Sequence, residues 1–285
     1  MSIEESKQAL SLPKSSIEES KEASNAPCPL TRAEELIQKF GPFKSSIDIK
    51  TEQFTEVVSV TDWTPLMPRY KPEFMPQIKR ALASPQTFDA RWNLQEWREV
   101  INDKKEGLLV WVRNADEGCA AFKATAIINR STQQIFRVIG DDKYRKMYDP
   151  IYDTGSFIER IADQTFIIYH KTKSVFVVGA RDFVLILHFN MTPEGVIYAL
   201  VMESDRNDLW PESKGIVRAL MPLGGWRFTP VPGEPNKTRC DYLAELNLKG
   251  SIPGFIMKAS IKDQGYQICK LRKAVECYLK DHNLI

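Results

Sequence analysis

An arginine and an aspartate stand four residues apart in the segment KYRKMYDP, residues 143–150. At this spacing Arg145 and Asp149 share one face of a helix. On an exposed surface, such a pair would contribute less than about 1 kcal/mol to stability. In the wall of a cavity, the guanidinium would need a partner, because an unpaired buried charge is very costly. A phosphate that accepts paired hydrogen bonds from Arg145 would be such a partner.

Other residues that could do chemistry form no recognisable motif. The sequence contains no GxSxG, HExxH, GxGxxG, P-loop or CxxC pattern. Its three histidines are His170 and His188, in expected strands, and His282, in the expected terminal helix. No spacing supports a nucleophilic arrangement of Cys240, His170 and Asp241. We therefore expect no catalysis, no cofactor and no metal.

Composition restricts the class of protein further. The 285 residues carry 39 basic and 37 acidic side chains, and this near balance argues against a nucleic-acid-binding protein. No apolar run approaches the ~18 residues of a membrane span. The N-terminus resembles neither a secretory signal nor a mitochondrial presequence. The five cysteines fit neither a zinc site nor a disulfide framework. We expect a monomer in the cytoplasm that contacts membranes peripherally and reversibly.

The chain divides into three parts that differ in composition and in the pattern of apolar residues. Residues 1–30 form a polar tail in which SIEESK occurs twice, and we expect disorder there. Residues 31–74 read as a short helix and a proline-rich connector. Residues 75–285 read as the folded domain. Apolar runs in it predict strands at 108–113, 121–128, 165–172, 182–189, 196–202, 217–221 and 241–246.

Helical spacing appears at two places in the folded part. One is the insertion after the second predicted strand, where Ile135 and Ile139 share a face. The other is a long helix after Pro253 with an apolar stripe that includes Gly265. This glycine indicates either close packing or a thin spot that faces a cavity. The element order predicts an α+β domain in which a helix covers one curved sheet.

Several motifs then occur in a fixed order: KYRKMYDP after Phe136, GARDFV at 179–184, ESKGIVRA at 212–219, GW at 225–226 and LKGSIP at 248–253. In order and spacing this set resembles START domains, the family of steroidogenic acute regulatory protein-related lipid transfer modules, over roughly residues 75–285. The resemblance implies a helix-grip fold, in which a curved antiparallel sheet wraps a lipid tunnel that a long C-terminal helix closes. It also implies one bound lipid, carried between membranes without catalysis.

The same resemblance suggests which head group is bound. Arg145 and Asp149 match the phosphate-binding arginine and nearby aspartate of the family's phosphatidylcholine carrier. The positions of its choline-binding aromatic rings fall on His170, Phe183, Pro222 and Ala244, of which only Phe183 is aromatic. In sterol-binding members a buried acid–base pair falls near His170 and on Leu187, so its arginine is absent here. A phospholipid is thus the first expectation, and a sterol or ceramide the alternative.

The resemblance also nominates the remaining site residues. Loop 205–214 and the C-terminal helix would form the tunnel entrance. Arg181 and Arg218 would hold loops through carboxylate pairs. A second hypothesis is an adaptor, in which residues 1–60 dock a protein partner and the lipid only changes the lid. The expected lipid-binding residues are Ile139, Arg145, Asp149, His170, Thr172, Phe183 and Leu187, and the expected lid or membrane contacts are Trp210, Met257, Ile261 and Gly265.

Overall fold

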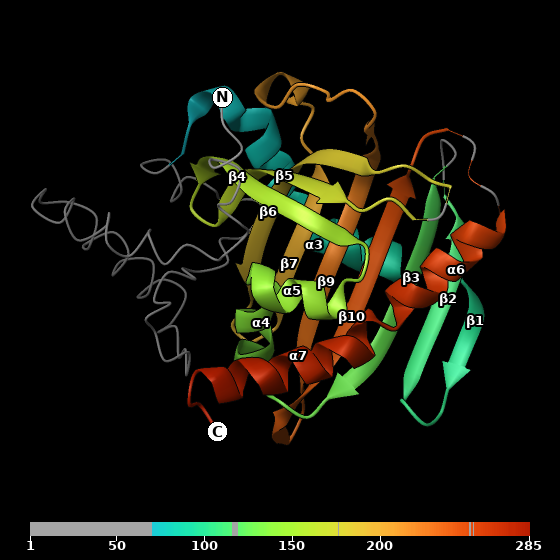
Figure 1. Ribbon diagram of the computed structural model, residues 1–285. Helices are drawn as coiled ribbons and strands as arrows, with labels where there is room; N and C mark the ends of the chain where they lie inside the picture. The colour runs from blue at the N-terminus through green and yellow to red at the C-terminus, as the bar shows by residue number, and fades with distance from the viewer. Residues whose placement is uncertain (1–69, 116–118, 176, 251, 253) are drawn as a thin grey trace, which may run out of the picture.

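A computed structural model of the chain describes residues 70–115, 119–175, 177–250, 252 and 254–285. The expected polar tail and most of the expected connector lie outside these residues. In the described part, a short turn of helix (η4, Pro72–Phe74) comes first. The strands of one sheet and five α-helices then follow along the chain (Figure 1). The helices are α3 (Met75–Trp92), α4 (Thr132–Ile139), α5 (Asp142–Tyr148), α6 (Gly254–Gly265) and α7 (Gln267–Asp281).

The sheet is antiparallel between all neighbours along its main path, β1-β2-β3-β10-β9-β7-β6-β5-β4. A short strand off this path, β8, pairs with β6 in parallel. This confirms the expected α+β class. The strands are β1 (Arg98–Asp103), β2 (Leu108–Asn114), β3 (Ala120–Ile128), β4 (Tyr152–Ala162), β5 (Thr165–Thr172), β6 (Arg181–Met191), β7 (Ile197–Glu203), β8 (Val217–Arg218), β9 (Leu220–Val231) and β10 (Glu234–Asn247).

The sheet has a helical layer on each face, with α3 behind it and α4 to α7 in front (Figure 1). Strand β6 is buried at every position because it lies between these layers. Its side chains alternate between the two faces, as the pleat of a strand requires. Val184 and Ile186 pack with α3, whereas Leu185 and Leu187 join the cluster on the other face. The continuous apolar run in the sequence therefore reflects burial on both sides.

Two predicted helices are each divided in the structure. The insertion after β3 becomes α4 and α5, separated at Gly140–Asp141, because Asp141 caps a new helix by accepting a hydrogen bond from Lys143 N. The C-terminal helix becomes α6 and α7, separated at Tyr266. The predicted strand at 217–221 is divided as well, between β8 and the start of β9. Strands β1 and β4 were not predicted.

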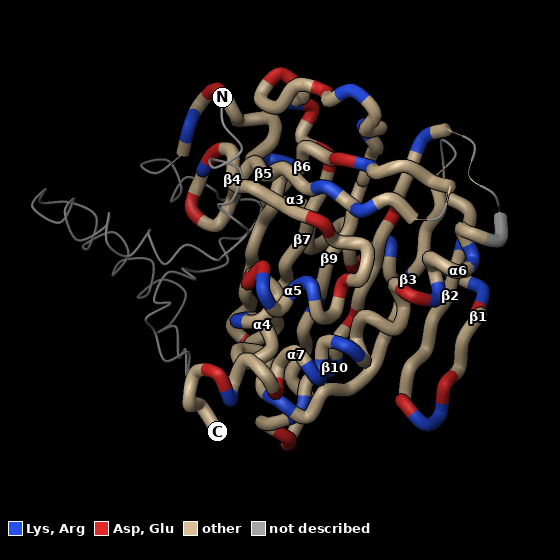
Figure 2. The backbone as a smooth tube through the Cα atoms, viewed as in Figure 1, with Lys and Arg blue, Asp and Glu red and all other residues tan. Residues whose placement is uncertain are grey.

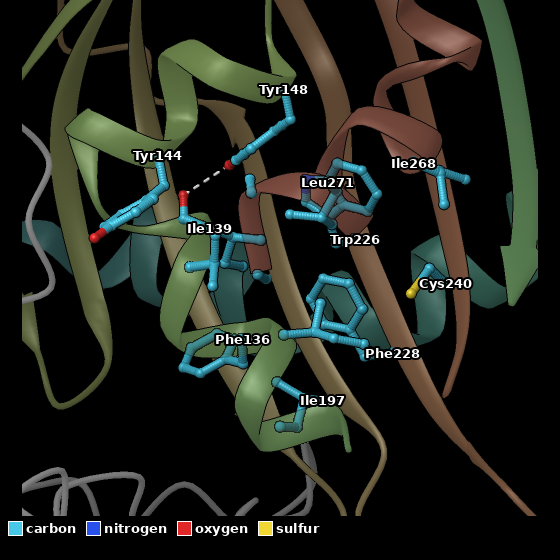
Figure 3. Packing of buried hydrophobic residues seen from close by; sticks show 14 of the residues in the cluster. Phe136, Ile139, Tyr144, Tyr148, Ile197, Trp226, Phe228, Cys240, Ile268 and Leu271 are labelled. Atoms are coloured by element: carbon cyan, nitrogen blue, oxygen red, sulfur yellow. Dashed lines mark hydrogen bonds between the residues drawn. The ribbon is translucent and has the colours of Figure 1, made fainter. Parts of the chain in front are cut away.

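Helices α4, α5 and α7 are fixed to the sheet by one apolar cluster (Figure 3). Ile268, Leu271 and Leu279 of α7 are fully buried, which confirms the expected apolar stripe. Trp226 of β9 meets Tyr148 of α5 edge to face, with ring centroids 6.2 Å apart. The Tyr148 hydroxyl donates to the carbonyl of Ile139 at 2.9 Å (Figure 3). This cluster sets the position of α5, the helix that carries Arg145. No described helix has the length and apolar character needed to cross a membrane.

Candidate functional site

A cavity of about 170 Å³ lies between the front face of the sheet and helices α5 and α6. Most of its wall is apolar and comes from β3, β5, β6, β7, β9 and α6, with side chains such as Phe122, Ile168, Phe189 and Ile256. Lys173 and Gly179 line it and are exposed to solvent, so the cavity reaches the surface beside the loop that joins β5 to β6. A long apolar space with few polar groups is typical of a ligand pocket.

Arg145 and Asp149 both lie in this wall, with Asp149 buried and Arg145 partly exposed. Nη2 of Arg145 is 3.7 Å from Oδ2 of Asp149, beyond hydrogen-bond range. The guanidinium also lies over the ring of Tyr152, 4.3 Å from its centroid, and 3.4 Å from both ring nitrogens of His170. The Arg145 side chain is 20% exposed, and Arg145 lines the cavity. Its Nε is buried without a hydrogen-bond partner.

Burial and mutual contact shift the pKa values of this group. Burial lowers the pKa of Arg145, but Tyr148 and Asp149 outweigh it and the net shift is upward. Burial raises the pKa of the Asp149 carboxyl, and Arg145 opposes this only in part. Burial and repulsion by Arg145 hold the pKa of His170 well below its usual range. His170 is therefore neutral at neutral pH, and Arg145 supplies the positive charge.

The seven residues expected to bind lipid all line the cavity: Ile139, Arg145, Asp149, His170, Thr172, Phe183 and Leu187. They come from α4, α5 and its C-cap, β5 and β6. Met257 and Ile261 of α6 line it as well. The structure thus brings these nine residues together around one space. Whether they contact a lipid stays a prediction.

Gly265 and Trp210 lie outside the cavity wall. A Cβ on Gly265 would lie 2.7 Å from Cγ2 of Val110, so close packing against β2 explains this glycine. The ring of Trp210 stacks on Tyr169, with centroids 4.3 Å apart. Membrane contact by Trp210 and Met257 stays a prediction.

Loop 205–214 was expected at the entrance, but it contributes nothing to the cavity wall that the described residues form. Arg218 holds this loop away by donating to Asn207 Oδ1 at 2.8 Å and to the carbonyl of Trp210 at 3.0 Å. The cavity reaches the surface at the exposed residues Lys173 and Gly179 of the β5–β6 loop. A role of loop 205–214 at the entrance stays a prediction.

Arg181 and Arg218 both hold loops, but by different means. Arg218 pairs with the Asp182 carboxylate, as expected. Arg181 donates to three backbone carbonyls, those of Gly179 at 2.6 Å, Leu248 at 3.1 Å and Lys249 at 3.2 Å. Its structural role agrees with the expectation, but its partners are carbonyls rather than carboxylates. It joins the β5–β6 loop to the segment before α6.

Sequence reasoning missed part of the polar and aromatic wall. Tyr148, Trp226 and Tyr242 line the cavity, and the rings of Trp226 and Tyr242 lie 4.5 Å apart. Gln264 of α6 and Gln267 of α7 line it too, and they hydrogen-bond to each other. A signal for Tyr148 was available, because it precedes Asp149 in KYRKMYDP. Trp226 also had a signal, the GW motif at 225–226. The other three come from segments in which the side that faces the cavity depends on the tertiary fold.

The chain matches the family model described as the START domain over residues 89–274. It is 28% identical over 135 residues to the mitochondrial steroidogenic acute regulatory protein of Danio rerio, which covers 46% of this chain and 47% of the relative. The chain thus spans about half the length of this curated relative.

Solved structures show the same fold. Human StAR-related lipid transfer protein 5 aligns with a TM-score of 0.63 at 20% identity, over 71% of this chain and 97% of the other. Human STARD10 aligns with a TM-score of 0.58 at 19% identity, over 69% and 81%. These likenesses confirm the helix-grip arrangement of a curved antiparallel sheet with C-terminal helices. Because the family model matches well over half of the sequence, the chain belongs to the START domain family, whose members generally bind and transfer lipids.

Proposed function

We propose that this protein binds one phospholipid in its cavity, with the lipid phosphate on Arg145, and carries it between membranes without catalysis. One observation carries this proposal. Arg145 is a cation that is only 20% exposed in a mostly apolar wall, and the carboxylate nearest to it lies 3.7 Å away. A phosphate oxygen at hydrogen-bond distance would complete its coordination.

The apolar wall suits the acyl chains of such a lipid. Each buried methylene is worth about 0.8 kcal/mol relative to water. A bilayer hides the same chains equally well, so transfer between a membrane and the cavity is nearly balanced. Selection among lipids therefore depends on the few polar groups, chiefly Arg145, Asp149 and His170. The names of the similar proteins, steroidogenic acute regulatory protein and lipid transfer protein, support the lipid-carrying role.

The head group beyond the phosphate is chosen by the surroundings of Asp149. Its Oδ1 is buried without a hydrogen-bond partner, so it favours a head group that brings a donor or a positive charge. The side-chain amide of Gln264 contacts this carboxylate and lowers its pKa, but less than burial raises it. Among the positions that bind choline in the family's phosphatidylcholine carrier, Phe183 alone is aromatic. The proposal therefore assigns phosphate binding to Arg145. It assigns no set of aromatic side chains to a choline group.

Native mass spectrometry after exposure to mixed liposomes tests this proposal, with fragmentation to identify the bound lipid. We expect one phospholipid per chain, and a loss of occupancy of about ten-fold or more in Arg145→Leu, because hydrogen bonds to charged groups are lost. Lys146→Leu is the matched control, since Lys146 lies on the same helix, is nearly half exposed and does not line the cavity.

A second variant separates binding from folding. Arg145→Leu leaves the Asp149 carboxylate buried without a cation beside it, which by itself destabilises the fold. Arg145→Leu with Asp149→Leu removes both charges and should fold, yet still lose phospholipid. A sterol or ceramide as the bound lipid, or full phospholipid occupancy in the folded double variant, would remove Arg145 from phosphate binding.

A further inference from the structure

A pair of glutamines lies where the two C-terminal helices meet. Gln264 is near the end of α6, Gln267 begins α7, and both residues line the cavity. We propose that Gln264 donates a hydrogen bond to an ester carbonyl of the bound phospholipid, and that the cavity thereby selects diacyl lipids over dialkyl lipids. This inference rests on the proposed function, because it assigns a second polar contact to the same lipid.

The burial of these glutamines is the first observation. Gln264 is 7% exposed and Gln267 is 1% exposed. Burying an amide without hydrogen bonds is costly, so buried polar side chains normally have partners. Nε2 of Gln267 donates to Oε1 of Gln264, but Nε2 of Gln264 is buried and has no hydrogen-bond partner among the described residues. The pair therefore leaves one donor for a ligand.

The hydrogen bond between the glutamines determines which end of the Gln264 amide is available. Oε1 is occupied by Gln267, so the amide nitrogen lies on the side of Asp149, and it lowers the pKa of that carboxyl. Electrostatics favours the same orientation, because an N–H group rather than a carbonyl oxygen should face a carboxylate. The last torsion of a glutamine side chain is soft, so a small rotation turns Nε2 toward a ligand in the cavity.

Gln264 lies between the polar and the apolar parts of the cavity wall. Nearer the start of α6, the residues that line the cavity are Ile256, Met257, Ser260 and Ile261. Gln264 follows Ile261 at a distance of about 4.5 Å along the helix axis, and beyond it lies Asp149, the neighbour of Arg145. In a diacyl phospholipid, the ester carbonyls likewise lie between the phosphate and the chains. With the phosphate on Arg145 and the chains along α6, an ester carbonyl comes to Gln264.

The charges around Gln264 favour a neutral acceptor. The charged residues of α6 are Lys258, Lys262 and Asp263, and all three are exposed and lie outside the cavity wall (Figure 2). Within the wall, the charge beside Gln264 is the carboxylate of Asp149. A carboxylate repels an anionic oxygen more strongly than it repels a neutral carbonyl. An ester carbonyl is therefore a better partner for Gln264 than a second phosphate oxygen.

Competition between diester and diether phosphatidylethanolamine of equal chain length tests this inference. The two lipids have the same head group, and the diether lacks only the carbonyl acceptors. The full chain is incubated with detergent micelles that contain equal amounts of both lipids, and native mass spectrometry identifies the bound one. We expect about ten-fold more bound diester than bound diether, because loss of the acceptor leaves Nε2 of Gln264 buried and unpaired.

Substitution of the glutamine should abolish this preference. In Gln264→Met the ratio of bound diester to bound diether should fall to about one, since methionine is of similar size and has no N–H donor. The double variant Gln264→Met, Gln267→Met removes both amides together, and it keeps the test decisive if the single variant does not fold. Gln133→Met is the matched control, because Gln133 lies on α4 outside the cavity wall. Its ratio should equal that of the parent chain.

Arg145→Leu separates this inference from the proposed function. It should lower the binding of both lipids, whereas the lipid that still binds should remain mainly diester because Gln264 is intact. A parent chain that takes up no phospholipid, here or from mixed liposomes, would overturn the proposed function and the ester contact with it. Equal binding of diester and diether by the loaded parent chain, or an unchanged preference in a folded Gln264 variant, would overturn the ester contact alone.

Discussion

Arg218 holds the carboxylate of Asp182 through two parallel hydrogen bonds, 2.8 Å from Nε to Oδ1 and 3.1 Å from Nη2 to Oδ2. Both side chains are almost completely buried, at 6% and 1% exposure. Because Arg218 also donates to Asn207 and Trp210, one guanidinium joins β6, β8 and the loop between β7 and β8. The pair belongs to the architecture of the fold rather than to the cavity, whose wall includes neither residue.

Loss of Arg218 should therefore be strongly destabilising. Arg218→Leu leaves the Asp182 carboxylate buried without a cation beside it, and we expect a loss of about 3–5 kcal/mol in the free energy of unfolding. Urea unfolding followed by circular dichroism measures it. Lys237→Leu is the control, because Lys237 and Glu234 form a pair that is nearly half exposed. The control should change stability by less than about 1 kcal/mol, and equal effects of the two substitutions would contradict this account.

Gly265 should resist substitution because of one close contact. Alanine normally stabilises a helix by about 1 kcal/mol relative to glycine. Here the added Cβ would lie 2.7 Å from Cγ2 of Val110, a stiff side chain that is fully buried in β2. We expect Gly265→Ala to destabilise the protein by about 1–3 kcal/mol.

A double-mutant cycle identifies the cause. Val110→Ala removes the obstructing methyl groups and leaves a small cavity, which costs stability by itself. In the presence of Val110→Ala, the substitution Gly265→Ala should become neutral or stabilising. Additive losses in thermal unfolding would show that the glycine is required for another reason.

His188 should make the protein less stable in acid. Burial lowers its pKa to about 4, whereas an unfolded histidine titrates near about 6.5. Between these values the unfolded chain binds a proton that the folded chain does not, so stability falls as the pH decreases from about 6.5 towards 4. Between pH 7 and pH 5, His188 should lower the free energy of unfolding by about 2 kcal/mol.

The substitution His188→Phe should remove that part of the pH dependence. The comparison is between urea unfolding curves of the parent chain and the variant at pH 7 and pH 5. His170 has a pKa shifted in the same direction, so the variant should keep part of the acid sensitivity. His282→Gln, at the exposed end of α7, should change nothing. An unaltered difference between the two pH values in His188→Phe would show that His188 does not contribute.

Local sequence patterns were sufficient to predict the helices and strands whose side chains follow a regular periodicity. The apolar run of β6 and the stripe of α7 predicted buried elements, and the four-residue spacing of Arg145 and Asp149 predicted a shared helix face. Strand β4 was missed because its register with β5 shifts at three places, which disturbs the alternation of its side chains. Such shifts depend on the neighbouring strand and leave no local signal.

Contacts between distant segments explain the remaining differences. Gly265 was ambiguous because its explanation is Val110, on another strand. Arg181 was expected to find a carboxylate, but the carbonyls of Leu248 and Lys249 are brought to it by the fold. Loop 205–214 contributes nothing to the described cavity wall, and two hydrogen bonds from Arg218, to Asn207 and Trp210, fasten it to β8.

Asp149 should determine how the cavity selects among charged head groups. Arg145 and Asp149 together carry no net charge, which suits a zwitterionic lipid, whereas Asp149→Asn would leave one positive charge beside the bound phosphate. Two charges about 4 Å apart near a protein surface interact by about 4 kcal/mol. The quantity of interest is the ratio of bound phosphatidylglycerol to bound phosphatidylethanolamine. We expect this ratio to be at least about ten-fold higher in the variant than in the parent chain.

Competition between the two lipids, read by native mass spectrometry at equal concentrations, measures this ratio directly. Asp153→Asn is the control, because Asp153 pairs with Lys171 on the half-exposed start of β4 and does not line the cavity. Its ratio should equal that of the parent chain. If Asp149→Asn folds, binds lipid and leaves the ratio unchanged, the head group lies away from Asp149, and this carboxylate does not select it.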